Sequence, residues 1–258
     1  MEENGIDPAA LTEEDLYPVD QLHARGIVAT KEHIEFARID ANMLVFKIGC
    51  GIGGAARVIA SSRQYTVTGI DLTPEYVEIA RVLTQRCGLD DSVDFQTANA
   101  TDLSFGDDSF DHVLCHNVTM NIEDKAGLAT EIARVLKPGG HFSCVEAGLG
   151  PAGEPSFPLP WARDATSNFL VTPDGMCAAL EKGGLRVVRR IDLNDVNMAF
   201  RKDMRERAER GEPPLTASYV AMGDDMPERQ QLLGRMITER RVVEHMVLAE
   251  KPYTNQHG

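Results

Sequence analysis

The stretch MLVFKIGCGIGG, residues 43–54, decides the fold of this chain. A short apolar run leads into glycines at positions 49, 51, 53 and 54. Glycine adopts positive φ without strain and lets another molecule approach the backbone closely. The stretch therefore predicts a strand that ends in a sharp turn and then a helix. The first N–H groups of such a helix are free to bind a carboxylate or a phosphate.

Strand and helix patterns alternate on both sides of this turn. The alternation predicts an α/β fold with a doubly wound, mostly parallel sheet covered by helices on both faces. Strands are predicted at 43–48, 65–70, 92–96, 112–116, 141–146, 185–193 and 242–252. Helices are predicted at 21–41, 53–61, 74–87, 125–136, 173–182, 196–210 and 227–241.

Composition narrows the functional classes. The 258 residues carry a formal net charge of −14, and 43% of them are apolar. A surface of this sign repels nucleic acid and anionic membranes, so neither is an expected partner. The five cysteines are scattered without a C-x-x-C pair, which indicates reduced thiols in a cytoplasmic protein. The acidic residues 1–20 do not resemble a signal peptide, and no apolar stretch approaches bilayer length.

An acid lies at the position where a nucleoside-binding fold needs one. Gly49, Gly51 and Gly54 satisfy the pattern G-x-G-x-x-G, and Asp71 follows Gly51 by 20 residues, at the end of the second predicted strand. A carboxylate there can accept hydrogen bonds from both hydroxyls of an adenosine ribose. The two candidate ligands at this point are NAD and S-adenosylmethionine.

Three further motifs separate those candidates. With IGCGIGG (48–54), the stretches GIDLTPEYVEIAR (69–81), ANATDLSFGDDSFDHVLCHNV (98–118) and RVLKPGGHF (134–142) follow in order. In this combination the chain resembles the class I S-adenosylmethionine-dependent methyltransferases, in the small-molecule branch related to ubiquinone- and menaquinone-biosynthesis methyltransferases. The stretch DQLHARGIVAT (20–30) is similar to the N-terminal segment of that branch.

The two helical stretches within 196–241 predict a helical insertion before the last strand. The resemblance implies a Rossmann-like, seven-stranded sheet whose last strand is antiparallel. The predicted domains are an N-terminal helical segment and lid at 1–41, a cofactor-binding core at 42–195, the insertion at 196–241, and a last strand and tail at 242–258. The resemblance also implies a small-molecule substrate as the partner of this chain. The sequence is compatible with a homo-oligomer.

The resemblance also implies the residues that hold the cofactor. The glycine turn accommodates its methionine part and Asp71 its ribose, while Asn99 takes the place of an aspartate that bonds the adenine amino group. An asparagine carbonyl can accept that bond without a charge. The full predicted set is Lys47, Gly49, Cys50, Gly51, Asp71, Leu72, Asn99, Ala100, His116 and Asn117.

Lys47 departs from the family pattern, which has Asp or Glu two residues before the first glycine. S-adenosylmethionine carries an ammonium and a sulfonium, and a like charge at about 4–6 Å costs on the order of 3–4 kcal/mol at an effective dielectric near 20. Five outcomes follow from the sequence: Lys47 bonds the cofactor carboxylate, pairs with an acid such as Asp71, loses its proton on burial, weakens cofactor binding, or belongs to a site that holds a different ligand.

Methyl transfer needs alignment and, for some acceptors, removal of a proton. The candidate general bases are His116 and Glu146 at strand ends and His23 in the N-terminal segment; no metal site is predicted. The acceptor pocket is expected among Tyr17, Phe157, Trp161, Phe169, Met198 and Met204. Three alternatives stay open: a cyclisation or isomerisation on the same scaffold, a binding protein without activity, and an oxidoreductase.

Overall fold

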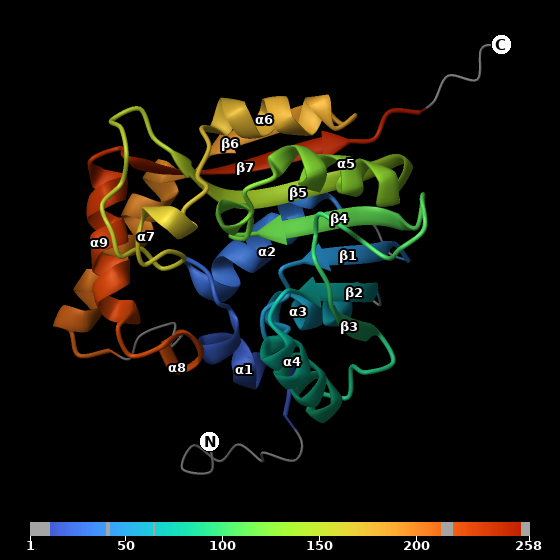
Figure 1. The fold of residues 1–258 in the computed structure, drawn as a ribbon. Coiled ribbons are helices and arrows are strands. Elements are labelled where there is room, and N and C mark those ends of the chain that lie inside the picture. Colours follow the sequence, from blue (N-terminus) through green and yellow to red (C-terminus); the bar gives the residue numbers. More distant parts are fainter. Residues whose placement is uncertain (1–10, 40–41, 64, 213–218, 254–258) are drawn as a thin grey trace.

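The computed structural model describes residues 11–39, 42–63, 65–212 and 219–253. Their strands form one seven-stranded sheet in the order β3-β2-β1-β4-β5-β7-β6 (Figure 1). The strands are β1 (Leu44–Ile48), β2 (Thr66–Asp71), β3 (Val93–Thr97), β4 (Phe110–His116), β5 (Leu136–Leu149), β6 (Arg186–Asp192) and β7 (Val242–Glu250).

The first five strands are parallel, and β7 pairs antiparallel with both β5 and β6. The predicted fold class is therefore confirmed, including the antiparallel last strand. Two elements differ from their predicted bounds by more than three residues. Strand β5 spans Leu136–Leu149, where 141–146 was predicted, and the helix predicted at 21–41 spans Gly26–Ala37. Phe110 pairs with Leu136 and His112 with His141, so residues 137–140 form an irregularity within the strand pairing.

The helices are α1 (Glu13–Asp20), α2 (Gly26–Ala37), α3 (Gly54–Arg63), α4 (Pro74–Arg86), α5 (Lys125–Val135), α6 (Pro173–Lys182), α7 (Asn194–Glu209), α8 (Tyr219–Met222) and α9 (Met226–Thr238), with short 3₁₀ turns at Thr119–Asn121 and Ala165–Ser167. Helices α7, α8 and α9 lie between β6 and β7 in the chain, where the insertion was predicted. None of the helices in the described ranges combines the length and apolar character that a bilayer crossing requires.

Helix α1 was not predicted, because residues 1–20 are polar. Its start is marked by a capping box, in which Thr12 Oγ1 accepts from Asp15 N and the Asp15 carboxylate accepts from Thr12 N. Residues 1–10 and 40–41 of the predicted N-terminal segment lie outside the described ranges, as does the predicted tail at 254–258.

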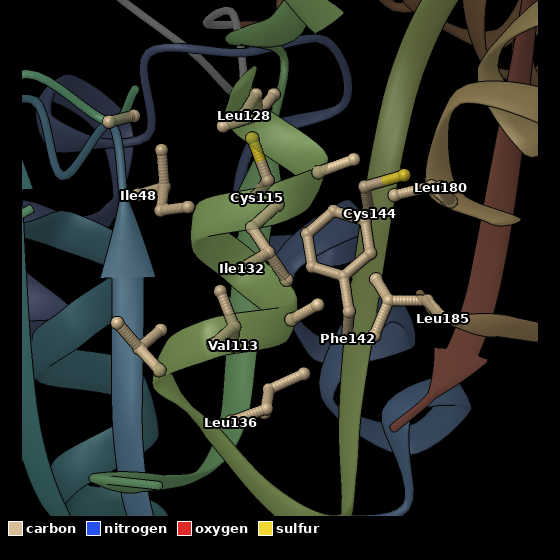
Figure 2. Close-up of a cluster of buried hydrophobic side chains, with 14 of the residues drawn as sticks. Ile48, Val113, Cys115, Leu128, Ile132, Leu136, Phe142, Cys144, Leu180 and Leu185 are labelled. Atoms are coloured by element: carbon tan, nitrogen blue, oxygen red, sulfur yellow. The ribbon is translucent and has the colours of Figure 1, made fainter. Parts of the chain in front are cut away.

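Both faces of the sheet are buried, as parallel sheets require. Alternate residues of β1 show this directly: Phe46 and Ile48 belong to one apolar cluster and Val45 to another. Figure 2 shows the first cluster, in which Ile132 of α5 and Phe142 of β5 pack with neighbouring strands. On the opposite face Phe36 of α2 packs against Val145.

Candidate functional site

A cavity of about 370 Å³ opens at the carboxyl ends of β1, β2 and β4, where ligands of doubly wound folds bind. Every residue predicted for the cofactor lines it: Lys47, Gly49, Cys50, Gly51, Asp71, Leu72, Asn99, Ala100, His116 and Asn117. The structure thus brings the complete predicted set together. Their part in binding stays a prediction.

The glycine turn forms one wall of this cavity because its backbone takes conformations that side chains disfavour. Gly49 has φ +64°, and a Cβ atom there would lie 2.1 Å from a methyl group of Val118. Cys50 N donates to Ile70 O at 2.7 Å, which fastens the turn to β2. The wall therefore consists of backbone, as the glycine pattern predicts.

Asp71 ends β2 and connects it to the turn. One carboxylate oxygen accepts from Gly51 N at 2.9 Å and the other from Thr73 N at 3.0 Å. Each oxygen keeps a second lone pair that can accept a further hydrogen bond. Asp71 is therefore both a structural link and an available acceptor at the edge of the cavity.

Asn117 carries the clearest sign of a missing ligand group. Its Oδ1 is buried and has no hydrogen-bond partner among the described residues, and its backbone has φ +52°, in the left-handed region. Buried acceptors are normally satisfied, and strained backbone gathers at functional sites. An ammonium donor placed in the cavity would fit this acceptor.

Asn99 differs from its expected role. Its Oδ1 already accepts from Thr101 N at 3.1 Å and Thr101 Oγ1 at 3.0 Å, forming a local turn. Asn99 and Ala100 both line the cavity, and the part of Asn99 in binding adenine stays a prediction.

Lys47 lies almost fully buried, at 3% exposure, with its ammonium turned back to the strand end. Nζ donates to the carbonyl oxygens of Ile48 at 2.8 Å and Gly49 at 3.0 Å. Among the described residues Lys47 forms no ion pair with Asp71, because its ammonium donates to these two carbonyl oxygens instead. Burial lowers the pKa of Lys47. Loss of its proton and weaker cofactor binding both stay predictions.

Two of the three predicted bases meet at the cavity. The rings of His23 and His116 stack with centroids 3.7 Å apart, and His33 of α2 lies edge-on to His116 at 5.4 Å. His23 is engaged through both nitrogens, with Nε2 3.0 Å from Thr30 Oγ1 and Nδ1 3.2 Å from Ala24 O. No hydrogen bond is found for the His116 ring within the described part of the chain.

Burial dominates the electrostatics of this pair. It lowers the pKa of His23 to about 4, and it holds the pKa of His116 well below 6.5, with further lowering by His23 and His33. Both imidazoles are therefore neutral at pH 7. A neutral ring can accept a proton, although a low pKa makes it a weak base.

Glu146 occupies a different position from the one predicted for a base. It is 1% exposed, and its carboxylate accepts from Val118 N at 3.2 Å and Thr119 N at 3.1 Å. Burial raises its pKa. It lines neither of the cavities described here, so the geometry favours a positioning role for Glu146, which holds the loop after β4.

A second cavity, of about 680 Å³, adjoins the first and shares His23 with it. Helices α7 and α9 form its walls, on the side toward which β1 and β4 point (Figure 1). Met198 and Met204 line it, as predicted for the acceptor pocket. Phe157 and Trp161 instead pack in a neighbouring apolar cluster, and Tyr17 and Phe169 line neither cavity.

Sequence reasoning missed several lining residues. Tyr76 of α4, Asn121, and Met222 of α8 complete the first cavity, and Phe200 and Arg201 line the second. Tyr76 follows the acid motif directly, a signal that was available. The approach of α8 is a tertiary contact that no local pattern encodes.

Residues 46–144 match the protein family described as a methyltransferase domain. This chain contains a methyltransferase domain. The match includes the glycine turn, Asp71 and the strand ends around the first cavity. The prediction of a class I methyltransferase, drawn from the motifs, is thereby confirmed for this segment.

Similar proteins extend the comparison. The methyltransferase GfsG of Streptomyces halstedii is 28% identical over 180 residues, which are 69% of this chain and 65% of that protein. Three of the curated relatives are matched over 23% to 65% of their own length. The structure of the [4+2]-cyclase SpnF has a TM-score of 0.69 at 21% sequence identity, and the superposition covers 88% of this chain and 82% of SpnF. A geranyl diphosphate methyltransferase in complex with SAM has a TM-score of 0.71 at 15% identity, covering 87% and 84%. At these identities the two structures show a common fold.

Proposed function

We propose that this chain transfers a methyl group from S-adenosylmethionine to a small, partly apolar metabolite. The single observation that carries the proposal is the first cavity, which assembles the whole predicted cofactor set and leaves Asn117 Oδ1 without a partner. Both features suit a ligand that has an amino-acid part and a nucleoside part.

The residues present fit this cofactor. Asp71 has free lone pairs for the ribose hydroxyls, Asn117 has an unused acceptor for the ammonium, and the turn at Gly49 leaves room for close approach. Bound there, the cofactor supplies a methyl group activated by a sulfonium.

The protein must align the donor with the acceptor and, for some acceptors, remove a proton. The first cavity aligns the donor, and His23 lines both this cavity and the second one, so an acceptor in the second cavity would meet the donor there. Where the acceptor must lose a proton, His116 is the better candidate base, because the nitrogens of His23 are engaged by Thr30 and Ala24. His23 then positions the His116 ring by stacking.

Calorimetric titration of S-adenosylhomocysteine tests the cofactor assignment. We expect one binding site in the wild type and at least about a tenfold loss of affinity in Asp71→Asn, which loses charge-assisted acceptors. Asp94→Asn, an exposed change on β3 outside the cavity, is the matched control and should bind as the wild type does. Absence of heat in the wild type would refute the assignment.

Transfer itself is tested by incubating the protein with methyl-labelled cofactor and a metabolite extract. Label in an acceptor supports the methyltransferase proposal.

A second candidate function is cyclisation or isomerisation with the cofactor unconsumed. The observation that favours it is Lys47, a buried cation where the family has an acid. Substrate turnover with no S-adenosylhomocysteine formed would support this alternative, and tight binding without any turnover would support a binding protein.

We also propose a cytoplasmic location and a small molecule as the partner. All five cysteines are unpaired thiols. The net charge of −14 argues against nucleic acid.

A further inference from the structure

The lining of the second cavity is positively charged, although the protein as a whole is acidic. Its lining includes four arginines and two acids, namely Arg25, Arg201, Arg205, Arg235, Glu239 and Glu244. The chain as a whole carries −14. A cavity of net positive charge in an acidic protein concentrates anions of small size.

The deepest of these cations is incompletely satisfied. Arg25 is 6% exposed, and its Nη1 pairs with Glu32 at 2.7 Å, but its Nη2 is buried and has no hydrogen-bond partner among the described residues. Arg25 also has φ +63°, in the left-handed region that residues with side chains rarely adopt. A ligand oxygen that reaches this guanidinium would accept a hydrogen bond from its unused Nη2 donor.

The other arginines also keep donors available. Arg201, Arg205 and Arg235 form no ion pair within 4.0 Å in the described part of the chain, and Arg201 donates only to Gln230 O, at 3.3 Å. Glu244 faces them from β7, interacts electrostatically with Arg201 and Arg25, and accepts from Asn197 Nδ2. The other acid of the lining, Glu239, pairs with Arg241 at 3.1 Å. The four arginines therefore outnumber the two acids, and one of these acids is already paired outside the lining.

The same cavity has an apolar wall. Met198, Phe200 and Met204 of α7 line it between the arginines. Methionine adapts its shape to different apolar bodies. The cavity therefore combines a surface for an apolar body with donors for an anion, and it meets the cofactor cavity at His23.

We propose that the methyl acceptor is an amphiphilic anion, whose carboxylate or phosphate oxygens bind Arg25 and Arg201 while its apolar body packs on Met198 and Phe200. This inference rests on the proposed function, since it names the substrate class of that site. It adds a requirement that methyl transfer alone does not impose: the acceptor carries a negative charge.

A matched pair of fluorescent probes tests the requirement. 8-Anilino-1-naphthalenesulfonate and N-phenyl-1-naphthylamine share an apolar body and differ by one sulfonate. Titrations are done on the full chain with S-adenosylhomocysteine in excess, so that the first cavity is filled. We expect the wild type to bind the anionic probe about tenfold more tightly than the neutral probe, the effect of one charge-assisted hydrogen bond.

Two variants test whether the preference for the anionic probe depends on an arginine of the second cavity. Arg201→Met should lower the affinity for the anionic probe about tenfold and leave the neutral probe unchanged. Lys202→Met removes the same charge from the exposed side of α7, outside the cavity, and should change neither affinity. If Arg201→Met does not fold by circular dichroism, Arg25→Met replaces it. Equal wild-type affinities for the two probes, or equal effects of Arg201→Met and Lys202→Met, would overturn the proposal.

Competition separates the two anion classes. Octanoate, octyl phosphate and octanol are added to the complex with the anionic probe, and displacement by octanol as strong as by the two anions would also overturn the proposal. Preference for octanoate or for octyl phosphate assigns the class. Calorimetry of S-adenosylhomocysteine reports on the first cavity separately, so loss of cofactor binding and loss of anion preference are distinct results.

Discussion

Replacing Asp20 by alanine should destabilise the protein more than any exposed charge change. The Asp20 carboxylate pairs with Arg57 Nη2 at 2.9 Å, and the two side chains are 1% and 0% exposed. Arg57 lies in α3, directly after the glycine turn, and also donates to Ile52 O and Thr84 Oγ1 at 3.0 Å. The pair therefore joins α1, the turn and α4.

The magnitude follows from burial. Removal of one partner leaves a buried charge unpaired, which costs about 3–5 kcal/mol. Asp20→Ala also removes the acceptor of Gln21 Nε2, now at 2.7 Å. We expect a loss near 4 kcal/mol, read from urea denaturation followed by circular dichroism. Asp20→Ala combined with Arg57→Met should cost at least about 2 kcal/mol less than the sum of the single changes.

A surface pair supplies the control. Lys202 and Glu206 lie 3.7 Å apart with side chains 73% and 50% exposed, so Glu206→Ala should change the free energy of unfolding by less than about 1 kcal/mol. If Asp20→Ala costs as little as this control, or if the two single changes are additive, the buried pair does not join these elements as described.

Four further outcomes are expected. Lys47→Met should strengthen binding of S-adenosylmethionine relative to S-adenosylhomocysteine by about tenfold in calorimetry, because a cation is removed from beside a sulfonium; an unchanged ratio would mean that Lys47 is already neutral. Glu146→Gln should lower the free energy of unfolding by about 1–3 kcal/mol in urea, since two backbone donors lose a charged acceptor; an unchanged midpoint would contradict the positioning role. Gly54→Ala should destabilise by about 1–3 kcal/mol, although alanine favours helices, because its Cβ would lie 2.4 Å from Asp20 O; a stabilised variant would argue against the close approach. Burial lowers the pKa of His112 from 6.5 to about 3, so on acidification the unfolded state takes up this proton at a higher pH than the folded state does. The contribution of His112 to the free energy of unfolding is therefore fully present above pH 6.5 and is lost as the pH falls toward 3. His112→Phe should flatten that dependence, and parallel curves for variant and wild type would exclude it.

The cofactor side of the site could be predicted because its residues follow strands. Asp71 and His116 are the last residues of β2 and β4, and Gly49 and Asn99 follow β1 and β3 closely. The carboxyl ends of such parallel strands meet at one edge of the sheet. A local pattern, once placed on strands, therefore places these side chains in one cavity.

The rest depends on contacts between distant segments. The stack of His23 on His116 and the pair of Asp20 with Arg57 join the N-terminal segment to the core, and no spacing in the sequence encodes them. Lys47 was recognised as unusual, yet the direction of its ammonium follows from two backbone carbonyls at the strand end. Helix α1 was missed although its capping residue, Thr12, was visible.

The position of β7 has a consequence for biosynthesis. Val242–Glu250 follow every other described element in the chain, yet they separate β5 from β6 in the sheet. The pairing of β6 is with β7 alone among the described strands. While the ribosome still holds these residues, β6 lacks the one described strand with which it pairs, so the sheet of the nascent chain stays incomplete until Val242–Glu250 have emerged.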